Sequence, residues 1–200
     1  LTEVPLIAGG PGYSMFPQAA LSYLGADAGI VGDGEDVFPG LLERLDRGEP
    51  LSGLPRLALP GRPLPEGSPR PRDLDRFSLP DPDLLDRSAY TPDELWVPVQ
   101  SRRGCPLCCA YCSTASIEGR AIRKRSPARV VRWMGRWADT GFRRFHFVDN
   151  TFNLPPSYAE ALCDGITGAG LKVQWLCILH PDRLTERLVR KMAAAGCRQV

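Results

Sequence analysis

The sequence predicts an α/β protein in which two stretches of alternating strands and helices are separated by a proline-rich connector. Three observations lead to this prediction. Short apolar runs that end in glycine alternate with amphipathic segments in the first quarter of the chain. The same alternation returns in the second half, and prolines are concentrated between the two stretches. Such repeated alternation of strand and helix is typical of sheets with parallel strands.

The first stretch contains two strand–helix pairs. Residues 4–10, VPLIAGG, and residues 28–35, AGIVGDGE, are short apolar runs followed by glycine, as in buried parallel strands that end in a tight turn. Residues 16–25 predict a short helix. Residues 35–50 predict an amphipathic helix whose apolar face carries Phe38, Leu41, Leu42 and Leu45.

The connector is marked by its prolines. Ten of the 20 prolines lie between Pro55 and Pro98, and the apolar periodicity of the first stretch is absent there. Prolines favour an extended and semi-rigid path, and a disordered linker is the alternative. We therefore divide the chain into a first α/β segment, a connector and a second α/β segment, at residues 1–54, 55–94 and 95–200.

The second stretch begins with a predicted strand at residues 95–101, LWVPVQS, which leads into a cysteine-rich loop. A helix is predicted to follow Ser126, as its cap, with Pro127 in the first helical position and Gly141 after its end. The remaining strands and helices are predicted in alternation at residues 143–149, 155–170, 172–179 and 185–196. This repeat fits a (β/α) barrel or part of one, in which functional loops follow the carboxyl ends of the strands.

Composition and charge narrow the class of protein. The net charge of +2 is too small to indicate nucleic acid or an anionic membrane as the main partner. The sequence has no apolar run of the length of a membrane span and no signal peptide at its start. We therefore predict a cytoplasmic protein. Because the chain begins with Leu and ends on CRQV, which resembles the start of a strand, we interpret it as the middle of a longer protein.

The seven cysteines indicate metal or redox chemistry rather than disulfides, since four of them are tightly clustered. The other three, Cys163, Cys177 and Cys197, lie singly in apolar segments and are predicted to be small buried apolar side chains.

The clustered cysteines are Cys105, Cys108, Cys109 and Cys112, in RRGCPLCCAYCST. Three kinds of site are compatible with them. A structural zinc site usually takes its two cysteine pairs from separate parts of a fold, whereas these pairs are adjacent. A thioredoxin-like dithiol would place one pair at the start of a helix. The third possibility is a [4Fe-4S] cluster bound by three thiolates with C-x3-C-x2-C spacing, which leaves one iron open.

This loop resembles that of the radical S-adenosylmethionine (radical SAM) superfamily. The resemblance rests on Gly104, the C-x3-C-x2-C spacing, Tyr111 just before the last cysteine, and the position of the loop after the first strand of a βα series. It implies a partial (β/α) TIM-like barrel, of which residues 95–200 are the first half. In that superfamily SAM binds the open iron, and its one-electron reduction gives a 5′-deoxyadenosyl radical that removes hydrogen from the substrate.

The same resemblance assigns residues to the cofactors. Cys105, Cys109 and Cys112 are implied to be the ligands of the [4Fe-4S] cluster, whereas Cys108 occupies a variable position and is not expected to bind iron. Tyr111 is implied to lie against the adenine of SAM.

The ends of the next two predicted strands carry further candidates. Asp149 and Asn150, in FVDNTF, stand where the superfamily meets the amino group of SAM, and their oxygens are suitable acceptors for an amine. Asp149 as the cap of a turn is the alternative. The third strand ends in LHPDR. Many relatives carry an arginine close to the end of this strand, whereas here His180 stands at that place and Arg183 follows further on.

The first stretch resembles the C-terminal part of a Rossmann-like cobalamin-binding domain. The resemblance rests on LIAGGPGYSMFP, with Gly9 and Gly10 as the candidate cobalamin contacts, and on GIVGDGEDVFPGLL, in which Asp33 replaces a more usual glutamate. Small residues at the end of a strand allow the backbone to approach a bulky cofactor. Glycines that only form turns are the alternative.

These resemblances imply a radical SAM enzyme, a cobalamin-dependent methyltransferase or cyclase that acts on an unactivated carbon of a small-molecule substrate. A reducing partner such as flavodoxin or ferredoxin is implied as well. The alternatives are a radical SAM methylthiotransferase or rearrangement enzyme without cobalamin, and a non-catalytic iron–sulfur protein. Neither a nucleic-acid partner nor a membrane span is expected.

Overall fold

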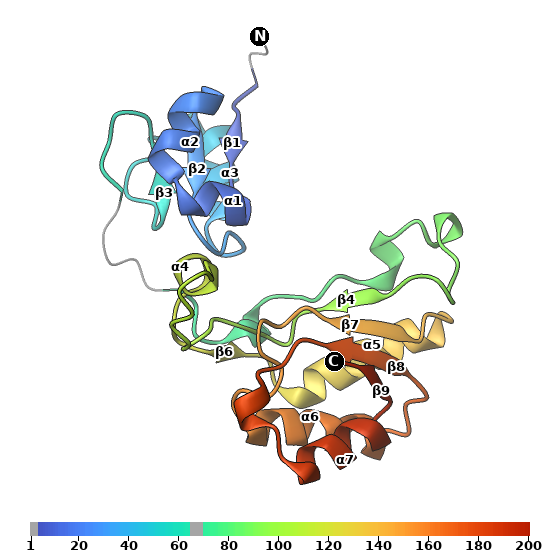
Figure 1. Ribbon diagram of the computed structural model, residues 1–200. Coiled ribbons are helices and arrows are strands. Elements are labelled where there is room, and N and C mark those ends of the chain that lie inside the picture. Colours follow the sequence, from blue (N-terminus) through green and yellow to red (C-terminus); the bar gives the residue numbers. More distant parts are fainter. Residues whose placement is uncertain (1–3, 65–69) are drawn as a thin grey trace. The chain divides into compact units, whose positions relative to one another are not determined.

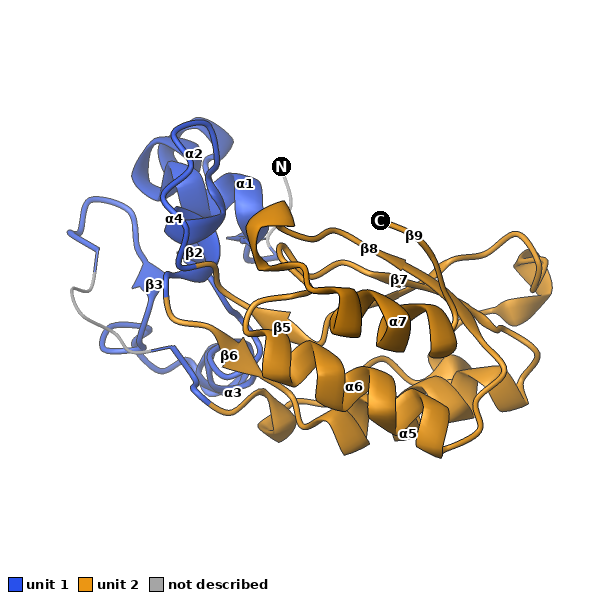
Figure 2. Ribbon diagram, turned by 60° about the horizontal axis from the view of Figure 1, so that its bottom comes forward, with its two compact units in different colours: residues 1–72, 106–120 blue, residues 73–105, 121–200 orange. Residues whose placement is uncertain are grey.

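The computed structural model describes residues 4–64 and 70–200, which fold as two compact units. The first unit comprises residues 1–72 and 106–120, and the second comprises residues 73–105 and 121–200 (Figure 2). Both units combine strands with helices, so the prediction of an α/β protein is confirmed.

The first unit contains a small three-stranded sheet in the order β1-β2-β3. β1 and β2 are parallel, with Ile7 opposite Ala28, and β3 is added antiparallel to β2. The elements of this unit are β1 (Ile7–Ala8), α1 (Gly10–Met15), α2 (Pro17–Leu24), β2 (Ala28–Ile30), α3 (Phe38–Asp46), β3 (Leu57–Ala58) and α4 (Thr114–Glu118). Sequence patterns predicted β1, α2, β2 and α3. They missed α1, because its glycines and proline have the composition of a turn.

Only part of the predicted apolar face of α3 is buried. Leu41 is completely buried and Leu45 packs beside it, in a cluster centred on β2. Phe38 and Leu42, predicted on the same apolar face, are exposed. A helix on a three-stranded sheet buries a narrower stripe than one that is covered on two sides.

The structure describes residues 55–64 and 70–94 of the predicted connector, and residues 65–69 lie outside the described ranges. β3 joins the first sheet, and residues 73–105 group with the second unit, whereas the predicted bounds at residues 54 and 94 stay a prediction. This part contains three short 3-10 helices, η1 (Leu74–Arg76), η2 (Pro82–Leu84) and η3 (Arg87–Ala89). Each begins at an aspartate whose carboxylate accepts a hydrogen bond from the N–H two residues later, which gives the proline-rich chain a defined path.

The second unit contains a parallel sheet in the order β4-β7-β8-β9, and its three helices lie on one face of that sheet (Figure 1). The elements are β4 (Val97–Val99), α5 (Pro127–Asp139), β7 (Arg144–Phe147), α6 (Pro156–Gly168), β8 (Gln174–Cys177), η4 (Pro181–Arg183), α7 (Glu186–Ala194) and β9 (Cys197–Gln199). A short antiparallel pair, β5 (Arg102–Arg103) and β6 (Arg123–Lys124), flanks the cysteine loop. Neighbouring strands follow the chain order, as expected for successive βα units of a barrel.

The first residues of α5 and α7 are held in different ways. Pro127 occupies the first turn of α5 as predicted, but the side chain of Ser126 makes no capping hydrogen bond. Instead, the N–H of Ser126 donates to the carboxylate of Asp75, at 3.0 and 3.1 Å from its two oxygens. In α7, the hydroxyl of Thr185 accepts from the N–H of Leu188, which is a regular side-chain cap.

Gly196, which follows α7, is required by its surroundings. Its φ is +96°, and a Cβ there would lie 2.2 Å from the carbonyl oxygen of Val173. We expect Gly196→Ala to lower the free energy of unfolding by roughly 2–4 kcal/mol, because both the left-handed backbone and the clash oppose a side chain. Chemical denaturation measures this effect. Gly168→Ala is the control, since a Cβ at that helical position meets nothing within 4 Å; a similar loss there would contradict the explanation.

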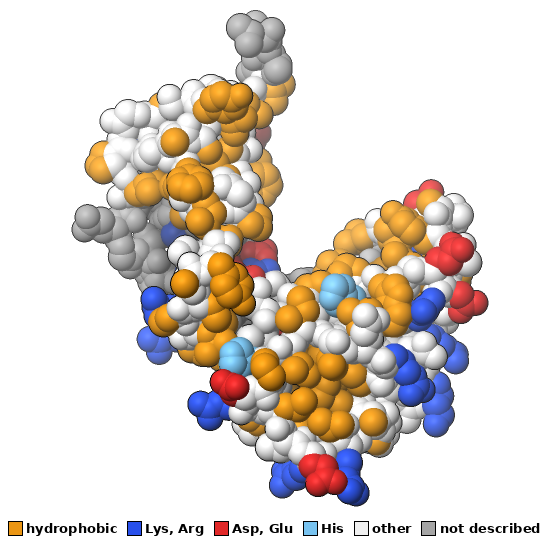
Figure 3. Space-filling model, in the orientation of Figure 1, with side chains coloured by type: hydrophobic (Ala, Val, Ile, Leu, Met, Phe, Trp, Pro, Cys, Tyr) orange, Lys and Arg blue, Asp and Glu red, His pale blue; other side chains and the backbone are white. Residues whose placement is uncertain are grey.

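The edge of the sheet at β9 is apolar. A hollow of about 250 Å³ lies beside β9 and α7, where hydrophobic side chains gather on the surface (Figure 3). Its apolar lining includes Leu179, Leu184, Val189, Met192 and Val200.

In the described ranges, no helix has both the length and the apolar character needed to cross a membrane.

Candidate functional site

The cysteine loop begins directly after β5 and passes from one unit into the other. Cys105 belongs to the second unit and is only 6% exposed, whereas the later cysteines of the loop group with the first unit. Cys109 is half-buried, and Cys108 and Cys112 are exposed. All four are free thiols, which is the state in which they can bind a metal.

Two of these thiols have distinct hydrogen-bond partners. The Sγ of Cys112 lies 3.3 Å from the hydroxyl of Thr114, and hydrogen bonds from Thr114 lower the pKa of the Cys112 thiol. The Sγ of Cys108 instead accepts from the guanidinium of Arg120 at 2.6 Å. A lowered pKa favours the thiolate, the form that binds iron, so the chemistry at Cys112 suits a ligand.

The side chains of the loop are not gathered into a preformed site. Within residues 4–64 and 70–200, no three Cys, His, Asp or Glu side chains are grouped so that they could hold a metal ion. The donor set nevertheless fits an iron–sulfur cluster, because it consists of free thiols at the carboxyl end of the first parallel strand. The assignment of Cys105, Cys109 and Cys112 as ligands stays a prediction.

The predicted cofactor contacts outside the cysteines also stay predictions, and the structure gives their surroundings. Tyr111 is 92% exposed. Gly9 and Gly10 follow β1, and Gly10 has a φ of +89°, which requires glycine. Gly9 has an extended backbone, and a Cβ there would make only an ordinary contact, 3.8 Å from the carbonyl oxygen of Ile30.

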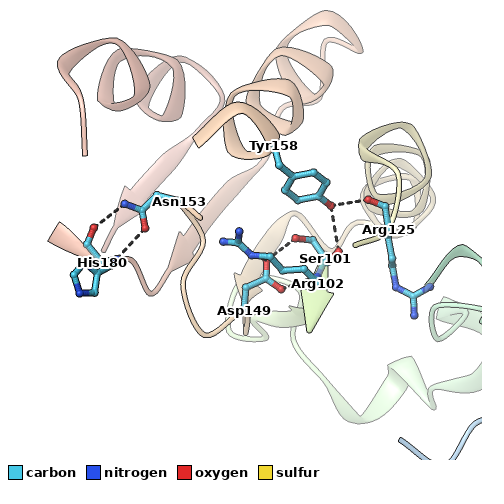
Figure 4. Close-up of polar contacts among 7 residues, drawn as sticks. All are labelled: Ser101, Arg102, Arg125, Asp149, Asn153, Tyr158 and His180. Carbon is cyan, nitrogen blue, oxygen red and sulfur yellow. Dashed lines mark hydrogen bonds and ion pairs between the residues drawn. The ribbon is translucent and has the colours of Figure 1, made fainter. Parts of the chain in front are cut away.

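Asp149, directly after β7, is completely buried and holds the chain that leaves β4 (Figure 4). Its Oδ1 accepts from the backbone N–H groups of Ser101 and Arg102, at 2.8 and 3.1 Å. Its Oδ2 accepts from the hydroxyl of Ser101 at 2.5 Å. The carboxylate therefore joins the ends of two adjacent strands. It also fixes the backbone at Arg102, three residues before Cys105.

Arg102 completes this buried group. Its side chain is 2% exposed, and its Nε lies 3.8 Å from Oδ2 of Asp149. Its guanidinium carbon lies 5.9 Å from the ring centre of Tyr158, which comes from α6. Burial lowers the pKa of Arg102, and the neighbouring carboxylate opposes this effect.

Tyr158 connects the group to the strand pair beside the loop. Its hydroxyl lies 3.2 Å from the carbonyl oxygen of Ser101 and 2.9 Å from that of Arg125 (Figure 4). Burial raises the pKa of Tyr158 to about 12. The guanidinium of Arg125 in turn donates to the carbonyl oxygens of Leu74 and Phe77. These hydrogen bonds hold the segment around η1 against Arg125.

Asn153 joins the ends of β7 and β8 in a similar way. Its amide donates to the carbonyl oxygen of His180 at 2.7 Å and accepts from the N–H of His180 at 2.9 Å (Figure 4). His180 is thus held through its backbone, and its imidazole Nδ1 lies 3.9 Å from the carboxylate of Asp182. Sequence reasoning identified His180 and Asp149, but it missed Ser101, Arg102, Asn153 and Tyr158. For Ser101 and Asn153, the available signal was their position shortly after the ends of β4 and β7.

The isolated cysteines are placed largely as predicted. Cys163 and Cys177 are buried, and burial raises the pKa of Cys163 to about 12. Cys197 is half-buried, and a hydrogen bond between Cys177 and Cys197 raises the pKa of the former and lowers that of the latter.

The raised pKa of Asp149 leads us to expect that the stability of the protein depends on pH. Burial, opposed by Arg102 and Ser101, raises the pKa of Asp149 to about 6, with Tyr158 and Cys177 as the other titratable groups that interact with it. The folded state therefore binds a proton more tightly than the unfolded state, and this contribution to stability is lost as the pH rises from about 4 to about 6. Relative to Asp149→Asn, we expect the wild type to lose about 3 kcal/mol across this range. Urea unfolding at several pH values measures the difference; parallel curves for both proteins would contradict it.

Comparison with known proteins identifies the family. The model of the radical SAM superfamily matches residues 99–200, which is half of the chain. The chain therefore belongs to the radical SAM superfamily. Members of this superfamily use a [4Fe-4S] cluster and SAM.

Individual relatives extend the similarity to the first unit. An uncharacterised methyltransferase of Pyrococcus horikoshii is 28% identical over 205 residues, which cover 99% of this chain and 44% of that protein. The anaerobic magnesium-protoporphyrin IX monomethyl ester cyclase of Rubrivivax gelatinosus is 30% identical over 189 residues, 86% of this chain and 33% of that protein. The chain thus spans less than half the length of either relative.

A solved structure shares the fold of both units. It is the radical SAM methyltransferase TsrM from Kitasatospora setae with cobalamin and a [4Fe-4S] cluster bound. The TM-score is 0.85 with 24% identity, and the match covers 99% of this chain and 42% of that one. This likeness confirms the predicted arrangement, in which an α/β segment precedes the first part of a radical SAM barrel.

Proposed function

We propose that this chain is part of a radical SAM enzyme that uses cobalamin to methylate or cyclise a small molecule at an unactivated carbon. The observation that carries the proposal is the loop with C-x3-C-x2-C spacing, which follows the first parallel strand of a unit matched by the superfamily. The relatives described as a methyltransferase and a cyclase support the choice of reaction.

In this proposal, Cys105, Cys109 and Cys112 hold the [4Fe-4S] cluster, and their free thiols are chemically suited to it. When bound, the cluster supplies the single electron that cleaves SAM. Cys108 stays outside the ligand set, and its contact with Arg120 is consistent with that exclusion.

The residues proposed to meet SAM have separate tasks. Tyr111 offers an exposed aromatic face for the adenine. Because both oxygens of Asp149 already accept hydrogen bonds from the chain after β4, Asp149 holds this strand end in place. Asn150, the next residue, is then the first candidate to accept from the amino group of SAM.

The first unit is proposed to contact cobalamin through Gly9 and Gly10. A Cβ added at Gly10 or at Gly12 would meet nothing within 4 Å, so the start of α1 leaves room for a bulky cofactor to approach the backbone. The corrin would be the source of the transferred methyl group in the methylation reaction, and the protein would orient it and exclude water.

Two further parts of the proposal concern the surroundings of the enzyme. A low-potential donor such as flavodoxin or ferredoxin would deliver the electron, and a cytoplasmic location would keep the seven free cysteines reduced.

The test uses the intact protein, purified and loaded with iron and sulfide without oxygen. We expect about four irons per chain, consistent with one cubane cluster, and consumption of SAM with formation of 5′-deoxyadenosine after addition of dithionite. Added cobalamin should be retained in a one-to-one ratio. Zinc in place of iron, or a cluster that does not react with SAM, would contradict the enzyme. Reaction with SAM without retention of cobalamin would instead favour a methylthiotransferase or rearrangement enzyme.

A further inference from the structure

The guanidinium of Arg102 is unusual because it is buried without hydrogen bonds. None of its three nitrogens has a hydrogen-bond partner among the described residues. The side chain is 98% buried, and its ion pair with Asp149 is long, at 3.8 Å between Nε and Oδ2. Figure 4 shows the guanidinium beside the carboxylate, with its outer nitrogens directed away from Asp149.

Asp149 does not accept a hydrogen bond from this guanidinium. Its two oxygens already accept from Ser101 and from the backbone of Arg102. A buried charge is costly unless it is both paired and hydrogen-bonded, and an unsatisfied buried group in a native protein calls for a specific explanation. The outer edge of Arg102 is therefore available to stabilise a further negative charge.

The position of Arg102 indicates where that negative charge lies. Arg102 precedes Cys105 by three residues, both belong to the second unit, and both side chains are buried. Three residues of fully extended chain span at most about 10 Å, so a cluster bound by Cys105 would lie close to Arg102.

We propose that Arg102 is a positioning residue whose buried positive charge, beside Cys105, stabilises the reduced state of the bound cluster. The inference rests on the proposed function. On reduction, one electron from an external low-potential donor adds one negative charge, and no bond to the protein forms or breaks. Since the reduction potential of an iron–sulfur cluster depends on nearby charges, the cation raises that potential and makes the electron easier to accept.

The test is a redox titration of the intact, anaerobically loaded protein, followed by the electron paramagnetic resonance signal of the reduced cluster. Arg102→Met removes the charge and keeps an unbranched apolar side chain; we expect a more negative midpoint potential. Arg102→Lys keeps the charge and should stay near the wild type. Asp149→Asn removes the opposing charge and should shift the midpoint to a more positive value.

Two variants serve as controls. Arg190→Met removes an exposed arginine of α7 that pairs with Glu186, and it should leave the midpoint unchanged. Arg102→Met leaves the buried carboxylate of Asp149 without its cation. If this single variant does not fold, the double variant Arg102→Met/Asp149→Asn is compared with Asp149→Asn alone. These two proteins differ only at Arg102, and the double variant should have the more negative midpoint.

The outcomes separate the inference from the proposed function. A wild type that forms no reducible cubane cluster would overturn both. A normal cluster whose midpoint is equal in Arg102→Met and Arg102→Lys, or equal in the double variant and Asp149→Asn, would overturn the role of Arg102 alone. Loss of iron from Arg102→Met but not from Arg102→Lys would also overturn it, because Arg102 would then support the fold of the loop.

Discussion

Replacing Cys109 with alanine is expected to abolish cluster binding, whereas the same change at the adjacent Cys108 leaves most of it. Cys109 belongs to the C-x3-C-x2-C set, and loss of one of three thiolates leaves two irons of the cube without a protein ligand. Cys108 is exposed and its sulfur contacts Arg120, so its removal costs no iron ligand. The two variants are closely matched, since they remove the same group from neighbouring positions.

Iron and sulfide content after anaerobic loading, together with the formation of 5′-deoxyadenosine, measures this effect in the intact protein. We expect Cys109→Ala to lose the product entirely. Equal loss in both variants would refute the assignment of ligands, and a deficit confined to Cys108→Ala would put Cys108 in the ligand set in place of Cys109.

Trp175→Ala is expected to lower the free energy of unfolding by about 3–5 kcal/mol, the largest effect on stability that we predict. Trp175, in β8, is completely buried and packs against Phe147 and Phe152, with ring centres 5.2 and 5.0 Å away. Its indole N–H donates to the carbonyl oxygen of Ala195 at 2.8 Å. Alanine would leave both a large cavity and a buried acceptor without its donor.

Urea denaturation measures this loss, with two variants for comparison. Trp175→Phe keeps most of the ring volume but gives up the hydrogen bond. Of the stability that this variant loses relative to the wild type, about 1 kcal/mol is attributable to that bond. Trp96→Ala removes a half-buried tryptophan whose ring lies 4.5 Å from the guanidinium of Arg144, and it should cost only about 1 kcal/mol. Equal losses at Trp96 and Trp175 would show that the sheet of the second unit is not organised around Trp175.

Local sequence patterns were sufficient for most of the second unit. The apolar runs at β4, β7 and β8, the amphipathic stripe of α5 and the glycine after α7 all follow from residue spacing that extends over a few positions. The pattern failed in the connector. Its prolines suppress periodicity, and its path depends on aspartate caps and on the contact between Pro80 and Trp133, 53 residues away.

The candidate site divides in the same way. The spacing of the cysteines was visible in the sequence because the loop is continuous. The role of Asp149 was only half visible: its place after a strand was predicted, but its partners lie 47 and 48 residues earlier in the chain. The burial of Arg102 had no sequence signal at all, since arginine is usually exposed.

By itself, then, the sequence determined the α/β class, the order of strands and helices and the thiol-rich loop, because each depends on residues close together in the chain. The tertiary structure alone decided which polar groups meet at the ends of the strands. Parallel strands bring together segments that are some 50 residues apart, and a buried carboxylate or guanidinium is satisfied only by the groups that this arrangement places beside it.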